Sequence, residues 1–447
     1  MDGPITGGLC MKEHPSGEDE VQAFDYNLPP DDLLPIPNAC TATVQDNIRM
    51  TPSDHWQDVR HINLLINKKI DYRPGDCVSI FPKNFPEDVD GLIKLMDWTI
   101  DADKPLTFVP AAGSYLDPTF MPALYSIHHT DPPTLRSLLL HNLDITAIPR
   151  RFFFEVLAKF TTDPMHRDRL LEFANPAYTD EFFDYTSRPR RSILEVLHDF
   201  PSVRLPWRWA PYIFPTLRAR QFSISSGGRL KHPDDASTAV HICAAIVKYR
   251  TVLKKVRQGV CSRYLASLRP GTQIRITFQR GSFKVSGAQA SKPLLMIAPG
   301  TGVAPMRSLI WERAMWRDAG EVSPLGEAVL IFGGRNSKKD FLYHPDWQNR
   351  ELDVTVLTAW SRDQREKIYV QDVVRKEAEM IWRLLVEEGG SVYVCGSSGK
   401  MPTGVRAAIV HAFVLAGKKL DWEYSTERAE DELSKIEKEG RYVQETW

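Results

Sequence analysis

A glycine-rich segment stands between an apolar run and a stretch with helical spacing. Residues 298–305 have the sequence Ala-Pro-Gly-Thr-Gly-Val-Ala-Pro and follow the run from Leu294 to Ile297. Glycine lets a backbone approach a pyrophosphate closely, and the start of the following helix presents free N–H groups to anionic oxygens. We interpret Gly300 and Gly302 as part of a phosphate-binding loop. An ordinary tight turn is the alternative, because short glycine motifs recur by chance.

A polar segment further along the chain, from Ser361 to Gln371, carries groups suited to a nucleotide with a 2′-phosphate. Arg362 and Lys367 could hold the phosphate, and Tyr369 could stack on adenine. The hydroxyl and the amide at the two ends could complete the hydrogen bonds. Such a composition is also common in solvated loops. Because the glycine-rich segment precedes it, we favour NADP over NAD as the ligand.

Two four-residue motifs earlier in the chain are candidates for further anion contacts. Residues 220–223 are Arg-Gln-Phe-Ser and offer a guanidinium. Residues 259–262 are Gly-Val-Cys-Ser and offer turn N–H groups and a hydroxyl. Each motif is weakly specific when taken alone.

Two single residues near the end of the chain are ambiguous. Cys395 ends a strand-like run, where its thiol would face a ligand at the edge of a sheet, but most buried strand cysteines are inert small hydrophobes. Trp447 is the last residue, and a large apolar ring is unusual at an exposed terminus. It either serves a site or fills a cleft in the core.

The elements that must position these residues follow two patterns. From about residue 289, short apolar runs alternate with helical segments, which is typical of a doubly wound domain with a buried parallel sheet. The ligand of such a domain lies at the carboxyl ends of the strands. The expected strands are 294–298, 328–332, 353–357 and 391–395. We assign residues 289–447 to this domain.

The preceding region predicts an antiparallel barrel or sheet that helices interrupt. Residues 84–212 show helical spacing and separate two groups of strand-like runs, so that residues 38–288 form one discontinuous domain. Residues 1–37 are rich in Gly, Pro and Asp and predict a flexible leader without a strand. The strand-like runs are 42–44, 61–67, 76–81, 220–225, 239–247 and 273–278.

Composition excludes several classes of protein. The chain has 447 residues and a formal net charge of -1, which indicates at least two ordinary globular domains and gives no sign of nucleic-acid binding. Its six cysteines are scattered without a CxxC pair, so neither a disulfide framework nor a metal site is expected. No signal core or membrane span is apparent, and we expect a cytoplasmic protein.

Taken in order and spacing, these motifs resemble the ferredoxin–NADP reductase-like half of the diflavin reductases, the family that includes cytochrome P450 reductase. The resemblance runs from about residue 38 to Trp447. It implies an antiparallel FAD-binding barrel with a helical insertion, followed by a doubly wound NADP-binding domain. Residues 47–51, 55–62, 188–197 and 220–226 and the closing Glu-Thr-Trp are most similar to the branch that serves cytosolic iron–sulfur protein assembly.

The resemblance also implies roles for individual residues. Phe222 would lie against the flavin ring, where many relatives have tyrosine, and Gly404 stands where relatives have an aspartate that contacts the nicotinamide nucleotide. Residues implied around hydride transfer are Ser223, Cys395, Glu445 and Trp447. Residues implied for FAD are Arg190, Arg220, Gln221, Phe222, Ser223, Gly259, Val260, Cys261, Ser262 and Trp447. Residues implied for NADPH are Gly300, Thr301, Gly302, Ser361, Arg362, Lys367, Ile368, Tyr369, Val370 and Gln371.

The resemblance implies an NADPH-dependent enzyme that passes electrons from FAD to a flavodoxin-like domain or an iron–sulfur acceptor protein. FMN is not expected on this chain, because residues 1–37 offer no strand, phosphate loop or sufficient length for a flavodoxin domain. Two alternatives use the same sequence: a single-flavin reductase of a ferredoxin or flavodoxin, and an interaction module without turnover.

Overall fold

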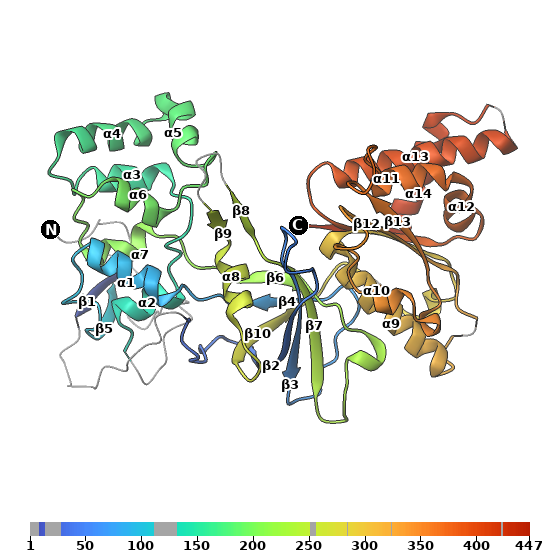
Figure 1. Ribbon diagram of the computed structural model, residues 1–447, viewed down its shortest axis with the longest axis horizontal. Helices are drawn as coiled ribbons and strands as arrows, with labels where there is room; N and C mark the ends of the chain where they lie inside the picture. Colours follow the sequence, from blue (N-terminus) through green and yellow to red (C-terminus); the bar gives the residue numbers. More distant parts are fainter. Residues whose placement is uncertain are drawn as a thin grey trace.

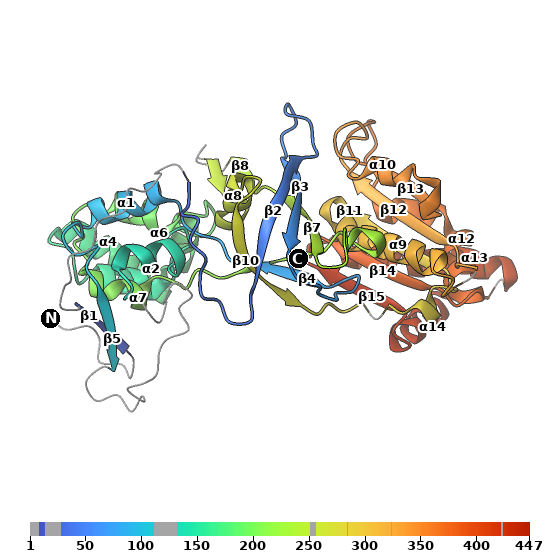
Figure 2. The ribbon, with the colours of Figure 1, turned by 90° about the horizontal axis from the view of Figure 1, so that it is seen from below.

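The computed structural model describes residues 9–13, 28–110, 132–250, 256–283, 285–322, 324–421 and 423–447. A helical lobe, a barrel and a doubly wound domain follow one another along its longest axis, with the barrel in the middle (Figure 1 and Figure 2). The C-terminus lies where the barrel meets the doubly wound domain in both views. Within the ranges above, no helix is long and apolar enough to cross a membrane.

The barrel consists of β2 (Cys40–Arg49), β3 (Val59–Ile66), β4 (Cys77–Ile80), β6 (Arg220–Ser223), β7 (Thr238–Ala245) and β10 (Gln273–Gln279). These antiparallel strands are ordered β6-β4-β10-β2-β3-β7, and a bridge between Ile224 and Ile242 brings the two edges together. Alternate residues of β3, such as Ile62 and Leu64, are fully buried inside. Helix α8 (Val260–Ser267) packs into the same core. The predicted antiparallel barrel is confirmed.

The helical lobe is the predicted insertion, and it has a hydrophobic core of its own. Thr134 and Ser192 begin two of its helices with capping boxes, in which the side chain accepts the N3 backbone N–H. The helices are α1 (Pro86–Leu95), α2 (Leu135–His141), α3 (Arg151–Leu157), α4 (Pro164–Ala174), α5 (Thr179–Tyr185), α6 (Ile193–Asp199) and α7 (Ala210–Ile213). A hairpin of β8 (Lys248–Arg250) and β9 (Val256–Gln258) precedes α8.

The predicted leader without a strand is wrong in the parts of 1–37 that the structure describes. Strand β1 (Leu9–Glu13) pairs antiparallel with β5 (Leu106–Pro110) of the insertion. Leu34 and Ile36 are each 4% exposed, and Lys83 Nζ donates to the carbonyl of Pro30 at 2.6 Å. A polar, Gly/Pro-rich composition says little about order when the partner strand or core is supplied by a distant segment.

The doubly wound domain has one parallel sheet in the order β13-β12-β11-β14-β15. Its strands are buried on both faces: Leu294 and Met296 point to one hydrophobic core, and Leu295 and Ile297 point to the other. The strands are β11 (Leu294–Pro299), β12 (Ala328–Gly334), β13 (Thr355–Trp360), β14 (Ser391–Gly396) and β15 (Tyr442–Thr446). Four were predicted, and β15 is an addition from the C-terminal segment.

Helices cover both faces of this sheet. On one face lie α9 (Val303–Asp318) and α10 (His344–Trp347), and on the other lie α11 (Val370–Lys376), α12 (Ala378–Trp382), α13 (Met401–Leu420) and α14 (Thr426–Lys438). The strand order reverses direction between β11 and β14, which is the point where doubly wound folds bind ligands.

A buried seam joins the barrel to α9. Arg307 donates to the carbonyl of Ser225 at 2.9 Å, and Ser308 Oγ donates to the carbonyl of Ser226 at 2.7 Å. A Cβ on Gly227 would stand 1.9 Å from the carbonyl oxygen of Ser308, so that only glycine allows this approach. The seam fixes the doubly wound domain against the barrel.

Candidate active site

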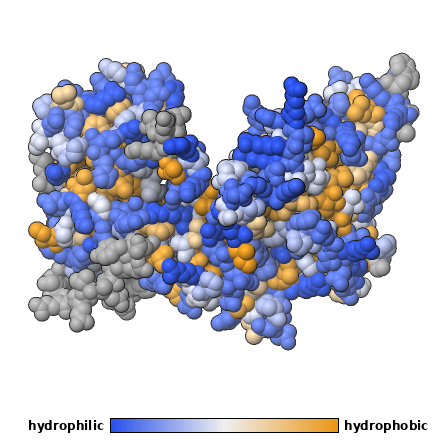
Figure 3. Space-filling view, in the orientation of Figure 1, coloured by the Kyte–Doolittle hydropathy of each residue, from blue (hydrophilic) through white to orange (hydrophobic). Residues whose placement is uncertain are grey.

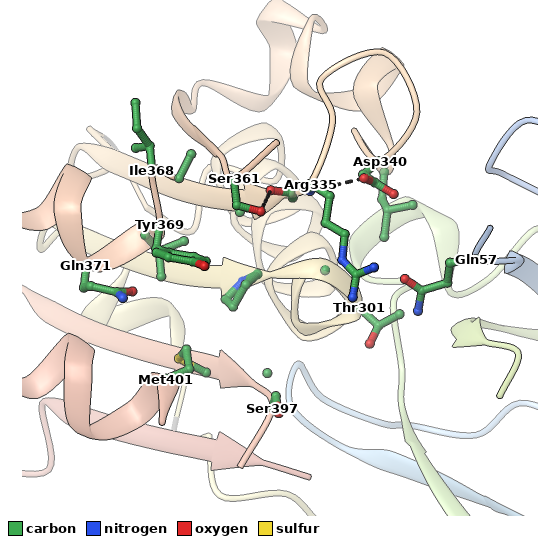
Figure 4. A pocket seen from close by; sticks show the side chains of 18 of the residues that line it. Gln57, Thr301, Arg335, Asp340, Ser361, Ile368, Tyr369, Gln371, Ser397 and Met401 are labelled. Atoms are coloured by element: carbon green, nitrogen blue, oxygen red, sulfur yellow. Dashed lines mark hydrogen bonds between the residues drawn. The ribbon is translucent and has the colours of Figure 1, made fainter. Parts of the chain in front are cut away.

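A cleft of about 680 Å³ lies at the carboxyl edge of the parallel sheet. The loops after β11, β12, β13 and β14 form most of it, and Gln57 and Val59 of the barrel complete one side (Figure 4). Its position is that expected for a ligand of this fold. The sequence-predicted residues that line it are Gly300, Thr301, Ser361, Ile368, Tyr369, Val370, Gln371 and Trp447.

The glycine-rich segment forms a tight turn, η5 (Gly300–Gly302), that leads directly into α9. Gly300 has a φ of +58°, which favours glycine. A Cβ on Gly302 would stand 2.2 Å from the carbonyl oxygen of Cys395, so that this glycine lets the loop pack on β14. Gly302 therefore shapes the cleft from behind and is not among the residues that line it.

The polar segment after β13 is divided between the cleft and its surroundings. Ser361 and Tyr369 line the cleft, whereas Arg362 and Lys367 lie in the exposed stretch between them. The backbone N–H of Ser361 donates to the carbonyl of Gly334 at 3.0 Å, which ties this segment to the end of β12. The two cations are close enough to the cleft along the chain to meet a ligand that extends from it.

Arg335 and Lys400 also line the cleft, and sequence reasoning missed both of these cations. In Figure 4 the side chain of Arg335 extends toward Gln57 and Thr301. Burial and the nearby Arg362 guanidinium lower the pKa of Arg335. Arg335 directly follows β12, so the rule that places ligands at strand ends could have identified it.

The cations in and beside the cleft have no carboxylate partner in the part of the chain that the structure describes. This holds for Arg335, Arg362, Lys367 and Lys400, whereas most other charged clusters of the domain are paired, such as Arg406 with Glu430 and Glu437. A concave site with several unpaired cations attracts anionic ligands such as nucleotide phosphates.

The flavin-side candidates lie on the barrel and the insertion. Residues 220–223 form the edge strand β6, with Arg220 and Gln221 exposed and Phe222 and Ser223 half-buried. Gly259 is the N-cap of α8, so that Val260, Cys261 and Ser262 form its first turn. Ser262 is tied down, since its Oγ accepts the Val247 N–H at 3.0 Å.

The structure brings the three flavin-side segments near one another. Arg220 is close enough to the buried Cys261 thiol to act on it electrostatically, although burial dominates and raises the pKa of Cys261 to about 12. Arg257, two residues before Gly259, donates to the carbonyl of Pro189 at 3.2 Å, beside Arg190. Arg190 is exposed with a φ of +50°.

Ser223, Cys395 and Glu445 meet where the barrel joins the parallel sheet, and Cys77 connects them. The Cys77 thiol lies 3.7 Å from Ser223 Oγ, within hydrogen-bonding distance for sulfur. Burial raises the pKa of Cys77, and the Glu445 carboxylate raises it further. Glu445 Oε1 accepts hydrogen bonds from Ser282 N at 2.7 Å and Ser282 Oγ at 2.6 Å, so that β15 is bound to the barrel loop after β10.

Cys395 is fully buried and does not line the cleft. Burial raises the pKa of its thiol well above the ordinary value, and the Glu445 carboxylate adds to this effect.

Trp447 lines the cleft with 53% of its surface exposed. Its backbone N–H donates to the carbonyl of Gly396 at 3.1 Å, and its own carbonyl accepts from Ser398 N at 3.0 Å. The main chain of the terminus is thus held while the indole stays open to solvent.

Comparison with known proteins agrees with this architecture. Residues 35–264 match the model of an FAD binding domain, and residues 296–407 match that of an oxidoreductase NAD-binding domain. NADPH-dependent diflavin oxidoreductase 1 of Aspergillus fumigatus is 47% identical over 429 residues, covering 93% of this chain and 65% of that protein. Its counterpart of Danio rerio is 37% identical over 437 residues, covering 96% of this chain and 68% of that protein. The chain belongs to the NADPH-dependent diflavin oxidoreductase family.

The two family matches confirm FAD and a nicotinamide dinucleotide as cofactors of this chain. The chain spans 65% of the length of the Aspergillus fumigatus relative. It also spans 65% of the length of the Schizosaccharomyces pombe relative, which is 36% identical to it. The activity of those full-length proteins is therefore only proposed for this chain.

Gly404, at the position where the resemblance implies an aspartate, lies within α13 beside Gln371, which lines the cleft. A Cβ at this position would stand 3.8 Å from the Gln371 amide, an ordinary contact distance. Because Gln371 lines the cleft, the position is close to the ligand and has room for a side chain. The absence of a carboxylate here is therefore not forced by packing.

Proposed function

We propose that this chain takes hydride from NADPH onto FAD and passes the electrons to a flavodoxin-like FMN domain or an iron–sulfur acceptor protein. The observation that carries the proposal is the C-terminal segment. Trp447 lines the nucleotide cleft, while Glu445, two residues earlier, is bonded to the barrel beside Cys77 and Ser223. One short strand thus connects the nucleotide site with the flavin-side residues.

The flavin-side residues suit the pyrophosphate of FAD. Among the described residues, the Arg220 guanidinium pairs with no carboxylate and donates only to the carbonyls of Arg218 and Ala219. The first turn of α8, at Val260 to Ser262, offers backbone N–H groups without a side-chain cap. Arg220 and this first turn would hold the pyrophosphate, and the half-buried Phe222 would support the flavin ring. When bound, FAD would supply the redox chemistry, because its ring accepts a hydride and can release the electrons singly.

The cleft residues suit NADPH better than NADH. Gly300 and Thr301 stand at the start of α9, where a pyrophosphate would meet backbone N–H groups. Arg362 and Lys367 would bind the 2′-phosphate, and Tyr369, which is 45% exposed, would stack on adenine. Arg335 and Lys400 add positive charge inside the cleft.

The residues between the two sites would orient the reactants and exclude water. The Trp447 ring, which makes no hydrogen bond among the described residues, would swing aside to admit the nicotinamide while its backbone stays paired to Gly396. Burial raises the pKa of the Cys77 and Cys395 thiols, so that both would remain neutral, and Cys77 would hold the Ser223 hydroxyl in place. Their task is positioning rather than proton transfer.

The electron acceptor would approach the hollow between the helical lobe and the doubly wound domain. Figure 3 shows this hollow above the barrel, and the C-terminus lies below it in Figure 1. Its position between the two lobes, above the barrel, supports docking of another protein domain there. The resemblance of residues 55–62 and 188–197 to one branch of the family leads us to propose cytosolic iron–sulfur protein assembly as the setting.

The test is anaerobic reduction of the purified chain. We expect a yellow protein with one FAD, which NADPH bleaches rapidly and NADH slowly. A colourless protein that does not take up FAD, or a bound flavin that NADPH leaves oxidised, would contradict the proposal. Equal bleaching by the two nucleotides would contradict the assignment of the 2′-phosphate contacts. Turnover with a separate flavodoxin domain, compared with an iron–sulfur protein, distinguishes the acceptors.

A further inference from the structure

A loop of the barrel, residues 51–58, reaches across to the loop that follows β12. His55 Nε2 lies 2.6 Å from Asp340 Oδ1, and the Arg335 guanidinium stacks on the Trp56 ring at 3.9 Å from its centroid. Asp54 also pairs with Lys339. Three consecutive residues of the 51–58 loop therefore contact the segment 335–340, which lines the nucleotide cleft.

Hydrogen bonds from Thr51 and Arg49 hold the backbone of the 51–58 loop. Thr51 Oγ1 donates to the carbonyl of Gln57 at 2.7 Å and accepts the N–H of Val59 at 3.1 Å. Arg49 Nη2 donates to the carbonyl of His55 at 2.9 Å. The loop therefore presents His55 and Trp56 from a fixed backbone, and no large ordering cost opposes their contacts.

Asp340 connects His55 with the start of the loop that lines the cleft. Its Oδ2 accepts the backbone N–H groups of Arg335 at 3.1 Å and Asn336 at 2.9 Å, while Oδ1 faces His55. The side chains of His55 and Asp340 are only 8% and 13% exposed. A charge-assisted bond that is shielded from water in this way is stronger than a surface pair. Removing the imidazole would leave the carboxylate with one side unsatisfied.

The loop after β12 is in turn bonded to the segment proposed to bind the 2′-phosphate. The Arg362 N–H donates to the carbonyl of Arg335 at 2.8 Å, and the Ser337 N–H donates to Asp363 Oδ2 at 2.9 Å. A continuous set of contacts thus leads from His55 and Trp56 through Arg335 to Arg362. The two guanidinium groups repel each other, so that their orientation depends on such external support.

We infer that His55 and Trp56 are positioning residues for the nucleotide, through which the FAD-binding barrel sets the preference for a 2′-phosphorylated ligand. The inference rests on the proposed function, because it takes the cleft to bind NADPH. The contacts are not needed to hold the domains together, since the buried pair Lys231–Glu312 and the bonds of Arg307 and Ser308 already form the seam. Their effect is therefore local to the cleft.

The test compares two nucleotides in the full chain loaded with FAD. Calorimetric titration with adenosine 2′,5′-bisphosphate measures binding without turnover, and steady-state assays give kcat/KM for NADPH and NADH. In His55→Ala and Trp56→Ala, we expect adenosine 2′,5′-bisphosphate to bind about tenfold more weakly, equivalent to about 1.4 kcal/mol. The ratio of kcat/KM for NADPH over NADH should fall by about the same factor, while the FAD content stays at one per chain.

Two further variants serve as controls. His55→Gln keeps an N–H donor toward Asp340 and should recover most of the affinity. Asp54→Ala removes only the exposed pair with Lys339, whose side chains are 69% and 35% exposed, and should behave like the unmodified chain. Unchanged selectivity in His55→Ala and Trp56→Ala, or an equal loss for NADPH and NADH, would overturn the inference. Failure of the unmodified chain to bind adenosine 2′,5′-bisphosphate would instead overturn the proposed function.

Discussion

The two cofactor regions of this chain are assembled in different ways. The nucleotide cleft collects residues from the carboxyl ends of parallel strands, and most of them lie between Pro299 and Met401. The flavin-side residues come from an edge strand, a helix N-terminus and the helical lobe, at Arg220, Gly259 and Arg190. The first site follows from the winding of one sheet. The second requires the barrel to close around a long insertion.

This difference implies that the two sites can be disturbed separately. Each offers cations without carboxylate partners among the described residues, and the contacts that join the two regions include the seam, the 51–58 loop and the C-terminal strand. A variant at one site should therefore change the affinity for one cofactor and leave the other unchanged. If every variant affected both, the division into two sites would be wrong.

The largest effect is expected at Arg220. Arg220→Ala removes the guanidinium proposed to hold the FAD pyrophosphate, and we expect FAD affinity to fall about 100-fold, equivalent to about 3 kcal/mol. Flavin fluorescence during titration of the apoprotein measures the loss. Binding of adenosine 2′,5′-bisphosphate should not change. Arg218→Ala removes an exposed guanidinium two residues away and is the matched control. A similar loss in both variants would show that charge near β6, rather than the position of Arg220, matters.

On the nucleotide side, Arg335 should matter more than Lys367. Arg335 lines the cleft and is half-buried, whereas Lys367 is exposed and interacts through solvent. We expect Arg335→Ala to weaken NADPH binding about 30-fold and Lys367→Ala only about threefold. Rapid-mixing measurements of flavin reduction at increasing NADPH give both dissociation constants. The opposite ranking would mean that the exposed Lys367, and not Arg335 in the cleft, contributes more of the binding energy.

The sequence could predict much of the nucleotide site and less of what supports it. Ser361 and Tyr369 line the cleft as expected, because residues after consecutive parallel strands meet at one edge. Arg335 obeys the same rule but lies in no recognisable motif. Gln57 and Trp56 belong to another domain, and nothing in their local sequence indicates that they approach the cleft.

Long-range pairing limited the fold prediction in the same way. The barrel and the doubly wound domain follow from periodic hydrophobic patterns that are visible locally. Strand β1 (Leu9–Glu13) was missed because its stability depends on β5, which lies far along the chain. Cys77 was missed as a neighbour of Ser223 because the two meet only through the pairing of β4 with β6.

Acid should weaken the seam between the two regions through His61. Burial and the nearby Arg307 guanidinium lower the pKa of His61 to about 4, with Asp46 and Asp346 opposing this effect weakly. The unfolded chain takes up a proton near pH 6.5 while the folded chain does not, so this contribution to stability is fully present above pH 6.5 and is lost as the pH falls toward 4. At pH 5 the loss should be about 1–2 kcal/mol.

Calorimetry at pH 7 and pH 5 tests this expectation. His61→Gln cannot titrate, and its loss of stability between the two pH values should be smaller than that of the unmodified chain. Burial lowers the pKa of the neighbouring His241 to about 2, with His61 contributing, so that His241 is neutral in the folded chain at both pH values. An identical pH dependence of the two proteins would exclude His61 as the acid-sensitive group.

The smallest expected effect is that of replacing a helical glycine by alanine. One such glycine in each region allows an effect on stability to be separated from an effect on ligand binding. Gly404 in α13 and Gly91 in α1 both lie inside helices, and a Cβ at either would meet nothing closer than 3.8 Å. Each change to alanine should therefore stabilise the chain by about 0.5–1 kcal/mol, visible as a small rise in Tm. Only Gly404 lies beside a residue that lines the cleft, Gln371. If Gly404→Ala raises the Tm but also weakens NADPH binding, while Gly91→Ala raises the Tm alone, the glycine is retained for the ligand. Equal behaviour of the two variants would mean that Gly404 has no role in nucleotide binding at the cleft.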